Sequence, residues 1–131
     1  MGYWVGFDFD GTLVEFPRAG QSHGGDIPSM VRLLRELVEQ GVEVRIVTAK
    51  AAYPELTAVV QRWLDSHGIG GVKITDRKDF EMVALFDDLA ISVEKGIGTI
   101  KTDMDYANRL LSLVGMSIVV DSGNARRHDV Q

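Results

Sequence analysis

The chain contains no cysteine among its 131 residues. A disulfide framework and a thiolate metal site are therefore both excluded, which suits a reducing compartment. No apolar run approaches the roughly 20 residues that a membrane-spanning helix needs. The N-terminus also lacks the basic segment followed by a long apolar one that is typical of a signal peptide. We therefore expect a cytoplasmic protein without a membrane partner.

The chain also has no surplus of positive charge, and its formal net charge is −5. This balance argues against a general nucleic-acid binder and against binding to anionic membranes. Hydrophobic residues make up 45% of the chain and charged residues 25%, as is ordinary for a globular protein. The length suits one domain with a single hydrophobic core.

Patterns typical of strands and helices alternate along the chain. This order predicts an α/β domain with a mostly parallel sheet, spanning residues 1–121. Residues 11–26 are rich in glycine and predict turns and loops, and residues 122–131 are expected to form a flexible C-terminal tail. The expected strands are 3–9, 42–50, 71–75, 82–88, 90–94 and 116–120, and the expected helices lie around 30–38, 56–64 and 104–114.

Polar side chains stand where several of these strands end. Asp8 and Asp10 stand at the end of the first strand, Thr48 ends the second, and Asp87 and Asp88 end the fourth. The carboxyl ends of parallel strands share one edge of the sheet, so we expect these side chains to converge there. One aspartate often caps a turn, but two acidic pairs would repel each other without a cation. An all-oxygen ligand set favours a hard ion, and Mg²⁺ is the usual one beside phosphate.

Three motifs in this order resemble those of the haloacid dehalogenase-like hydrolases. The motif "DFDGTL" (8–13) is similar to the first motif of that superfamily. "IVTAK" carries Thr48 where the superfamily keeps a threonine or serine, and "LFDD" (85–88) is similar to its acidic fourth motif. The resemblance covers most of the chain and implies a single Rossmann-like, three-layer domain.

The resemblance also implies a role for each aspartate. Asp8 would be the nucleophile that attacks phosphorus and forms an aspartyl-phosphate. Asp10 would be the general acid that protonates the leaving oxygen, and then the base that activates water. Mg²⁺ would be held by Asp8, the backbone carbonyl of Asp10, and Asp87, with Asp88 helping directly or through water. The cation would allow an anionic nucleophile to approach an anionic phosphate.

Residues that would bind the phosphoryl group follow from the same resemblance. Gly11 and Thr12 would shape the turn with amides aimed at the phosphate, and the Thr48 hydroxyl would bind a phosphoryl oxygen. The third motif needs a lysine or arginine, and the window before the fourth motif contains Lys73 and Lys78. We favour Lys78, which follows the third strand, because Lys73 lies inside that strand.

Other basic side chains are weaker candidates. Lys50 and Arg77 are further alternatives for the third motif, although a charged residue near a loop is usually only solvated. Residues 14–26, called the flap below, carry Arg18 and His23. Arg18 is a candidate for a contact with the leaving group, whereas a single histidine in a polar loop more often faces solvent.

The windows in which this superfamily inserts a cap domain are short here. Residues 13–26 and 76–82 leave no room for a folded insert, so the resemblance implies a capless member. Capless members act on large substrates or use a neighbouring subunit as a lid. The acidic balance favours a small phosphorylated substrate with a homo-oligomer as the lid, while a macromolecular phosphate ester stays open.

These observations predict a Mg²⁺-dependent phosphomonoesterase, in which Asp8, Asp10, Thr48 and Lys78 are the catalytic residues. A phosphotransferase with the same intermediate is an open alternative. A regulatory module that binds Mg²⁺ and phosphate with little turnover is another, although such a module has no chemical need for Asp10. A receiver-type signalling domain fits less well, because its phosphorylated aspartate would lie in mid-chain.

Overall fold

The computed structural model describes residues 2–121 and 124–129. It divides into two compact units, Met1–Asp88 and Leu89–Gln131. The first unit holds every aspartate of the acidic motifs.

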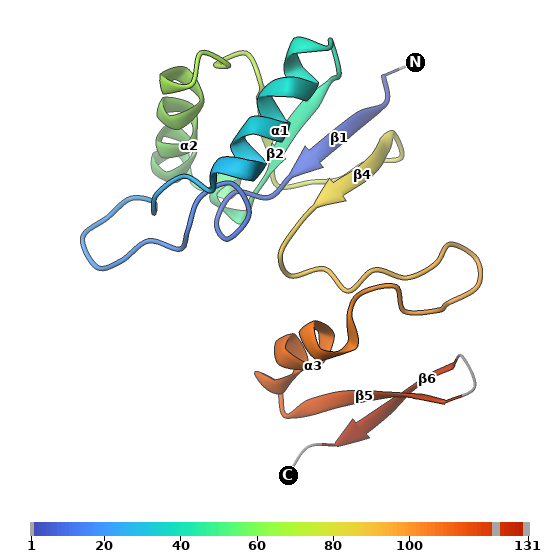
Figure 1. The fold of residues 1–131 in the computed structure, drawn as a ribbon. Coiled ribbons are helices and arrows are strands. Elements are labelled where there is room, and N and C mark those ends of the chain that lie inside the picture. The colour runs from blue at the N-terminus through green and yellow to red at the C-terminus, as the bar shows by residue number, and fades with distance from the viewer. Residues whose placement is uncertain (1, 122–123, 130–131) are drawn as a thin grey trace. The chain divides into compact units, whose positions relative to one another are not determined.

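A four-stranded parallel sheet forms the centre of the first unit. The strands lie in the order β3-β2-β1-β4, with β1 between β2 and β4 (Figure 1). The predicted α/β class and parallel sheet are thereby confirmed, and the topology is compatible with a Rossmann-like fold. The strands are β1 (Trp4–Phe7), β2 (Val44–Val47), β3 (Lys73–Thr75) and β4 (Met82–Phe86).

Two α-helices pack on one face of this sheet. Helix α1 (Pro28–Glu39) and helix α2 (Pro54–Ser66) each begin with the proline that the sequence places in the first turn, where the missing N–H costs nothing. Alternate side chains of β2 enter the same buried cluster as both helices, which fixes the register of the strand. The buried cluster consists of Phe7, Phe9, Leu13, Val14, Val31, Leu34, Val44, Ile46, Val60, Trp63 and Leu64.

The connection between β3 and β4 is short and contains no helix. Residues 76–81 lead from the carboxyl end of β3 to the amino end of β4, which lies beyond β2 and β1 in the sheet. Asp79 holds this connection: its carboxylate accepts a hydrogen bond from Trp4 Nε1 at 2.8 Å and one from an Arg45 guanidinium nitrogen at 3.3 Å. The Trp4 side chain is 1% exposed, so the connection and a buried indole stabilise each other.

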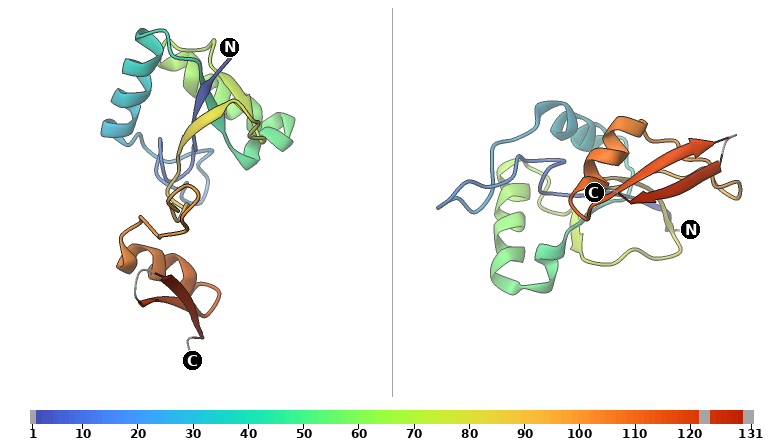
Figure 2. Two further views of the ribbon diagram at one scale, coloured as in Figure 1. Left: turned by 90° about the vertical axis from the view of Figure 1, so that its right-hand side faces the viewer. Right: turned by 90° about the horizontal axis from the view of Figure 1, so that it is seen from below.

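The second unit contains helix α3 (Met104–Ser112) and the strands β5 (Met116–Asp121) and β6 (Asn124–Asp129). The strands form an antiparallel hairpin, drawn in red and best seen on the right of Figure 2. The strand expected at 116–120 therefore exists, but its partner is β6 and not the parallel sheet.

One expectation for this unit is wrong. Residues 90–94 form no strand, and only Val93 makes an isolated bridge, to Ile100. Within the segment 122–131, predicted as a tail, residues 124–129 form β6, and residues 122–123 and 130–131 lie outside the described part. Asp121 pairs with Asn124. Among the described residues, the longest apolar stretch of helix falls short of what crossing a membrane requires.

Candidate active site

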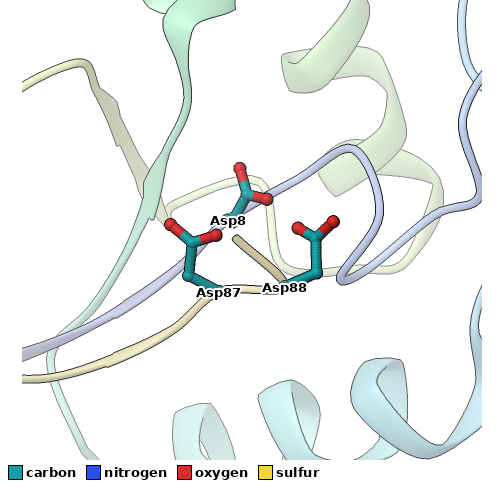
Figure 3. A group of neighbouring side chains, drawn as sticks. All are labelled: Asp8, Asp87 and Asp88. Carbon is teal, nitrogen blue, oxygen red and sulfur yellow. The ribbon is translucent and has the colours of Figure 1, made fainter. Parts of the chain in front are cut away.

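Three carboxylates meet at the carboxyl edge of the parallel sheet. Asp8 directly follows β1, and Asp87 and Asp88 directly follow the neighbouring strand β4. The amide of Asp8 donates to the carbonyl of Phe86 at 2.9 Å, which keeps the two chain segments in register up to the acidic residues. One oxygen from each carboxylate lies within 4.8 Å of the others (Figure 3). The convergence of these three side chains is as the sequence predicted.

Crowding of these carboxylates alters the acidity of Asp8. Burial, a hydrogen bond with Asp88 and the negative charge of Asp87 together raise the pKa of Asp8 from 3.8 to about 7. Each of these effects disfavours the charged form of a carboxyl group. A divalent cation among the same oxygens would reverse this balance, because it favours all three charged forms. The donor set fits a hard ion such as Mg²⁺, which prefers oxygen ligands.

A tight turn after β1 links Asp8 to Asp88. The Thr12 hydroxyl lies 3.4 Å from Asp8 Oδ2 and 3.2 Å from Asp88 Oδ1, and it accepts a hydrogen bond from the Asp88 amide at 3.2 Å. Gly11 adopts a φ of 88°, and a Cβ there would collide with the Asp88 carboxylate. The sequence "GT" therefore brings the turn against the acidic pair.

The sequence predicts that the amides of this turn aim at a phosphate. In the structure, these amides donate within the turn instead. The Gly11 N–H donates to the Val14 carbonyl at 2.7 Å, and the Thr12 N–H donates to the Phe9 carbonyl at 3.2 Å. Both donors are thus used inside the turn, because closing so tight a turn pairs its own backbone groups. Gly11 and Thr12 contribute to the site by shaping the turn and by the Thr12 hydroxyl.

The Asp10 side chain is not part of the acidic cluster. Its Oδ1 forms an ion pair with Lys50 Nζ at 3.1 Å, with the two side chains only 20% and 14% exposed. The backbone carbonyl of Asp10, predicted as a metal ligand, stays a prediction. The sequence favours Lys78 over Lys50 as the third-motif lysine. No spacing rule pairs Asp10 with Lys50, because the two residues are 40 positions apart.

Thr48 lies where the sequence placed it, directly after β2. Its amide donates to the Thr75 carbonyl at 2.9 Å, and the residue is only 5% exposed. The Thr48 hydroxyl accepts a hydrogen bond from the Lys50 amide at 3.1 Å and so caps the short 3₁₀ helix η1 (Ala49–Ala52). A hydroxyl that accepts one bond can still donate its proton, so Thr48 retains a donor for a phosphoryl oxygen.

The other predicted cations lie outside the acidic cluster. Lys73 and Lys78 are both exposed, and no ion pair within the described ranges includes either of them. Arg77 lies 4.0 Å from Asp76 in the exposed connection. Arg18 is exposed in the flap, where its backbone N–H donates to the Gln21 side chain at 3.0 Å. The third-motif lysine therefore stays a prediction.

The His23 ring contacts the core, whereas the sequence favours a solvent-facing histidine at this position. Its ring lies edge-on to that of Phe9, with centroids 6.0 Å apart, and Nδ1 is 2.7 Å from the Gly24 carbonyl oxygen. These contacts hold the flap against the core and give His23 a structural role.

An open cavity of about 300 Å³ adjoins the acidic cluster. Apolar side chains of Ile27, Met30 and Phe86 line it together with the carboxylates of Asp87 and Asp88. Gly11 and Thr12 of the turn complete its lining.

Comparison of the chain with protein-family models, with curated proteins and with solved structures finds no match. The chemistry of the site must therefore be argued from its residues. The half-buried carboxyl of Asp8 lies beside two others, and the Thr12 hydroxyl bridges it to Asp88. Such a group is suited to hold a divalent cation and to present one oxygen as a nucleophile.

Proposed function

We propose that this protein is a Mg²⁺-dependent phosphomonoesterase of the haloacid dehalogenase-like type, which acts through an aspartyl-phosphate on Asp8. The observation that carries the proposal is the cluster of Asp8, Asp87 and Asp88, whose oxygens lie within 4.8 Å of one another. Such a cluster is costly without a cation. Bound Mg²⁺ would screen the charge of the incoming phosphate and orient it toward Asp8.

The proposed reaction has two steps. An Asp8 oxygen attacks phosphorus, the bond from phosphorus to the ester oxygen breaks, and the departing oxygen takes a proton from Asp10. The Asp10 carboxylate then takes a proton from water while the water oxygen attacks phosphorus, and the bond to Asp8 breaks. Inorganic phosphate leaves, and Asp8 and Asp10 return to their starting states. Thr48 would donate its hydroxyl proton to a phosphoryl oxygen, and Lys78 would offset its charge.

The proposal includes an active site without a cap domain. The flap and the connection 76–81 are the two segments at which a cap would be inserted, and both are short. A small phosphorylated substrate is favoured because the net charge of −5 opposes binding of nucleic acid. A second copy of the chain would then serve as the lid.

Hydrolysis of an aryl phosphate with and without Mg²⁺ tests this function. We expect turnover that requires Mg²⁺ and falls by at least about 100-fold in Asp8→Asn and in Asp10→Asn. Asp105→Asn is the matched control, because Asp105 is exposed on α3 and should leave turnover unchanged. Equal activity of Asp8→Asn and wild type would refute the proposed nucleophile.

A regulatory module that binds Mg²⁺ and phosphate is the second candidate. It is favoured by the position of Asp10, whose carboxylate pairs with Lys50 and lies outside the acidic cluster. Such a module would bind Mg²⁺ and inorganic phosphate in calorimetry without turning over the aryl phosphate. A phosphotransferase would instead release little inorganic phosphate until an alcohol acceptor is added.

A further inference from the structure

Lys50 connects Asp10 to the flap. Its ammonium group lies 3.1 Å from Asp10 Oδ1 and 3.2 Å from the carbonyl oxygen of Ser22 in the flap. The same nitrogen lies 5.1 Å from the centre of the buried Phe9 ring, within the range of a cation–π contact. One side chain therefore contacts the candidate general acid, a flap carbonyl and the core.

The backbone on both sides of Lys50 is fixed by hydrogen bonds. Its amide donates to the Thr48 hydroxyl at 3.1 Å, and its carbonyl accepts from the Tyr53 amide at 3.1 Å and the Thr57 hydroxyl at 3.2 Å. The lysine thus projects from a capped turn that follows β2 in the chain and packs against α2 and β3. A side chain anchored in this way can hold its partners in place, which a lysine on a loose loop cannot do.

We infer that Lys50 is a positioning residue that holds the Asp10 carboxylate and the flap together for the proton transfers of the proposed reaction. Both proton transfers depend on the carboxyl group of Asp10. Each transfer needs an oxygen of that group within hydrogen-bond reach of the reacting group. The ion pair occupies Oδ1 and leaves Oδ2 for the leaving oxygen or for water. The inference rests on the proposed function.

Direct phosphate binding by Lys50 is the competing role. An ammonium group has three N–H donors, and the contacts with Asp10 and Ser22 use two of them. The third N–H is left for a phosphoryl oxygen, so the count of donors does not separate the two roles and kinetics must do so.

The two steps of the reaction separate these roles. An aryl phosphate with a good leaving group needs little help from an acid, so a misplaced Asp10 should slow attack by water more than it slows formation of the aspartyl-phosphate. In Lys50→Met we expect a burst of aryl alcohol larger than in wild type, accumulated phosphoenzyme, and a steady-state kcat lower by roughly 10- to 100-fold. Loss of a phosphate-binding cation would instead slow the first step, raise KM and give no burst.

Two further variants complete the kinetic test. Lys50→Arg keeps a cation that can reach both partners, and we expect it to restore at least part of the lost kcat. Arg62→Gln is the matched control, because it removes one exposed charge from α2 and should behave as wild type. Lys50→Met without a burst and with a raised KM, or with unchanged kinetics, would overturn the inference.

Hydrogen exchange of the flap amides tests the same connection without activity. We expect faster exchange over residues 14–26 in Lys50→Met than in wild type, restored in Lys50→Arg and unchanged in Arg62→Gln. If wild type hydrolyses no phosphate ester, the proposed function fails, and exchange alone decides whether Lys50 holds the flap. If wild type is active and neither exchange nor burst changes in Lys50→Met, only the role of Lys50 is refuted.

Discussion

The hydroxyl of Thr12 lies 3.2 Å from Asp88 Oδ1, although the two residues are 76 positions apart. The Thr12 hydroxyl oxygen also accepts a hydrogen bond from the Asp88 amide at 3.2 Å. Thr12 belongs to the turn after β1 and Asp88 follows β4, so this contact joins the two acidic motifs. Groups that bond to ligating carboxylates set their orientation. The threonine of the first motif therefore helps to build the proposed metal site.

Replacement of Thr12 by valine should separate this role from packing. Thr12→Val keeps the shape of the side chain and removes its hydroxyl, so the Asp88 amide loses its acceptor. We expect Mg²⁺ affinity to fall by roughly tenfold and stability to fall by about 1–2 kcal/mol, measured by calorimetry and by denaturant unfolding. Thr12→Ser keeps the hydroxyl and should retain most of the affinity. Equal affinities in the valine and serine variants would contradict the role of the hydroxyl.

Gly11 and Gly41 form a matched pair for testing the turn. Both have positive φ values, 88° and 82°, but a Cβ on Gly11 would meet Asp88 whereas one on Gly41 would meet nothing within 4 Å. Gly41→Ala should cost about 1–2 kcal/mol from backbone strain and leave Mg²⁺ binding unchanged. Gly11→Ala should cost more and also weaken Mg²⁺ binding, because Asp88 must move. Equal effects in calorimetry would show that only strain matters.

Stability without metal should depend on pH through Asp8. The pKa of Asp8 is raised from 3.8 to about 7 by burial, its bond to Asp88 and the charge of Asp87. Between these values the folded protein holds a proton that the unfolded chain has lost, so this contribution to stability falls as pH rises and levels off above about 7.

Asp8→Asn removes that contribution and provides the comparison. In EDTA, wild type should lose stability relative to Asp8→Asn between pH 4 and pH 7, as followed by urea unfolding. Added Mg²⁺ should stabilise wild type more at pH 8 than at pH 6, because the cation competes with the proton for Asp8. Parallel pH profiles for the two proteins would contradict the raised pKa.

Sequence patterns predicted the acidic cluster because strand ends fix positions. Asp8 and Asp87 each follow an apolar run. Neighbouring parallel strands bring their carboxyl ends to one edge of the sheet, independently of how the side chains are oriented. The partner of Asp10 depends instead on where the long Lys50 side chain reaches, and a sequence pattern does not fix that direction. A strand pattern at 116–120 likewise predicts an element but does not choose its partner, so the β5–β6 hairpin was missed.

The contact between Trp4 and Asp79 yields a second pH prediction. Hydrogen bonds from Trp4 Nε1 and the Glu81 amide, helped by the nearby Arg45, lower the pKa of Asp79 from 3.8. A lowered folded-state pKa contributes stability that is present above 3.8 and is lost as pH falls through the folded value. Asp79→Asn removes the charge, so its stability deficit relative to wild type should shrink as pH falls from 5 to 2. Asp76→Asn removes a charge from the same connection but leaves the hydrogen bond from Trp4 to Asp79 in place, so it is the matched control. Acid unfolding followed by tryptophan fluorescence measures both variants, and a constant deficit for Asp79→Asn would show that its charge does not hold the connection.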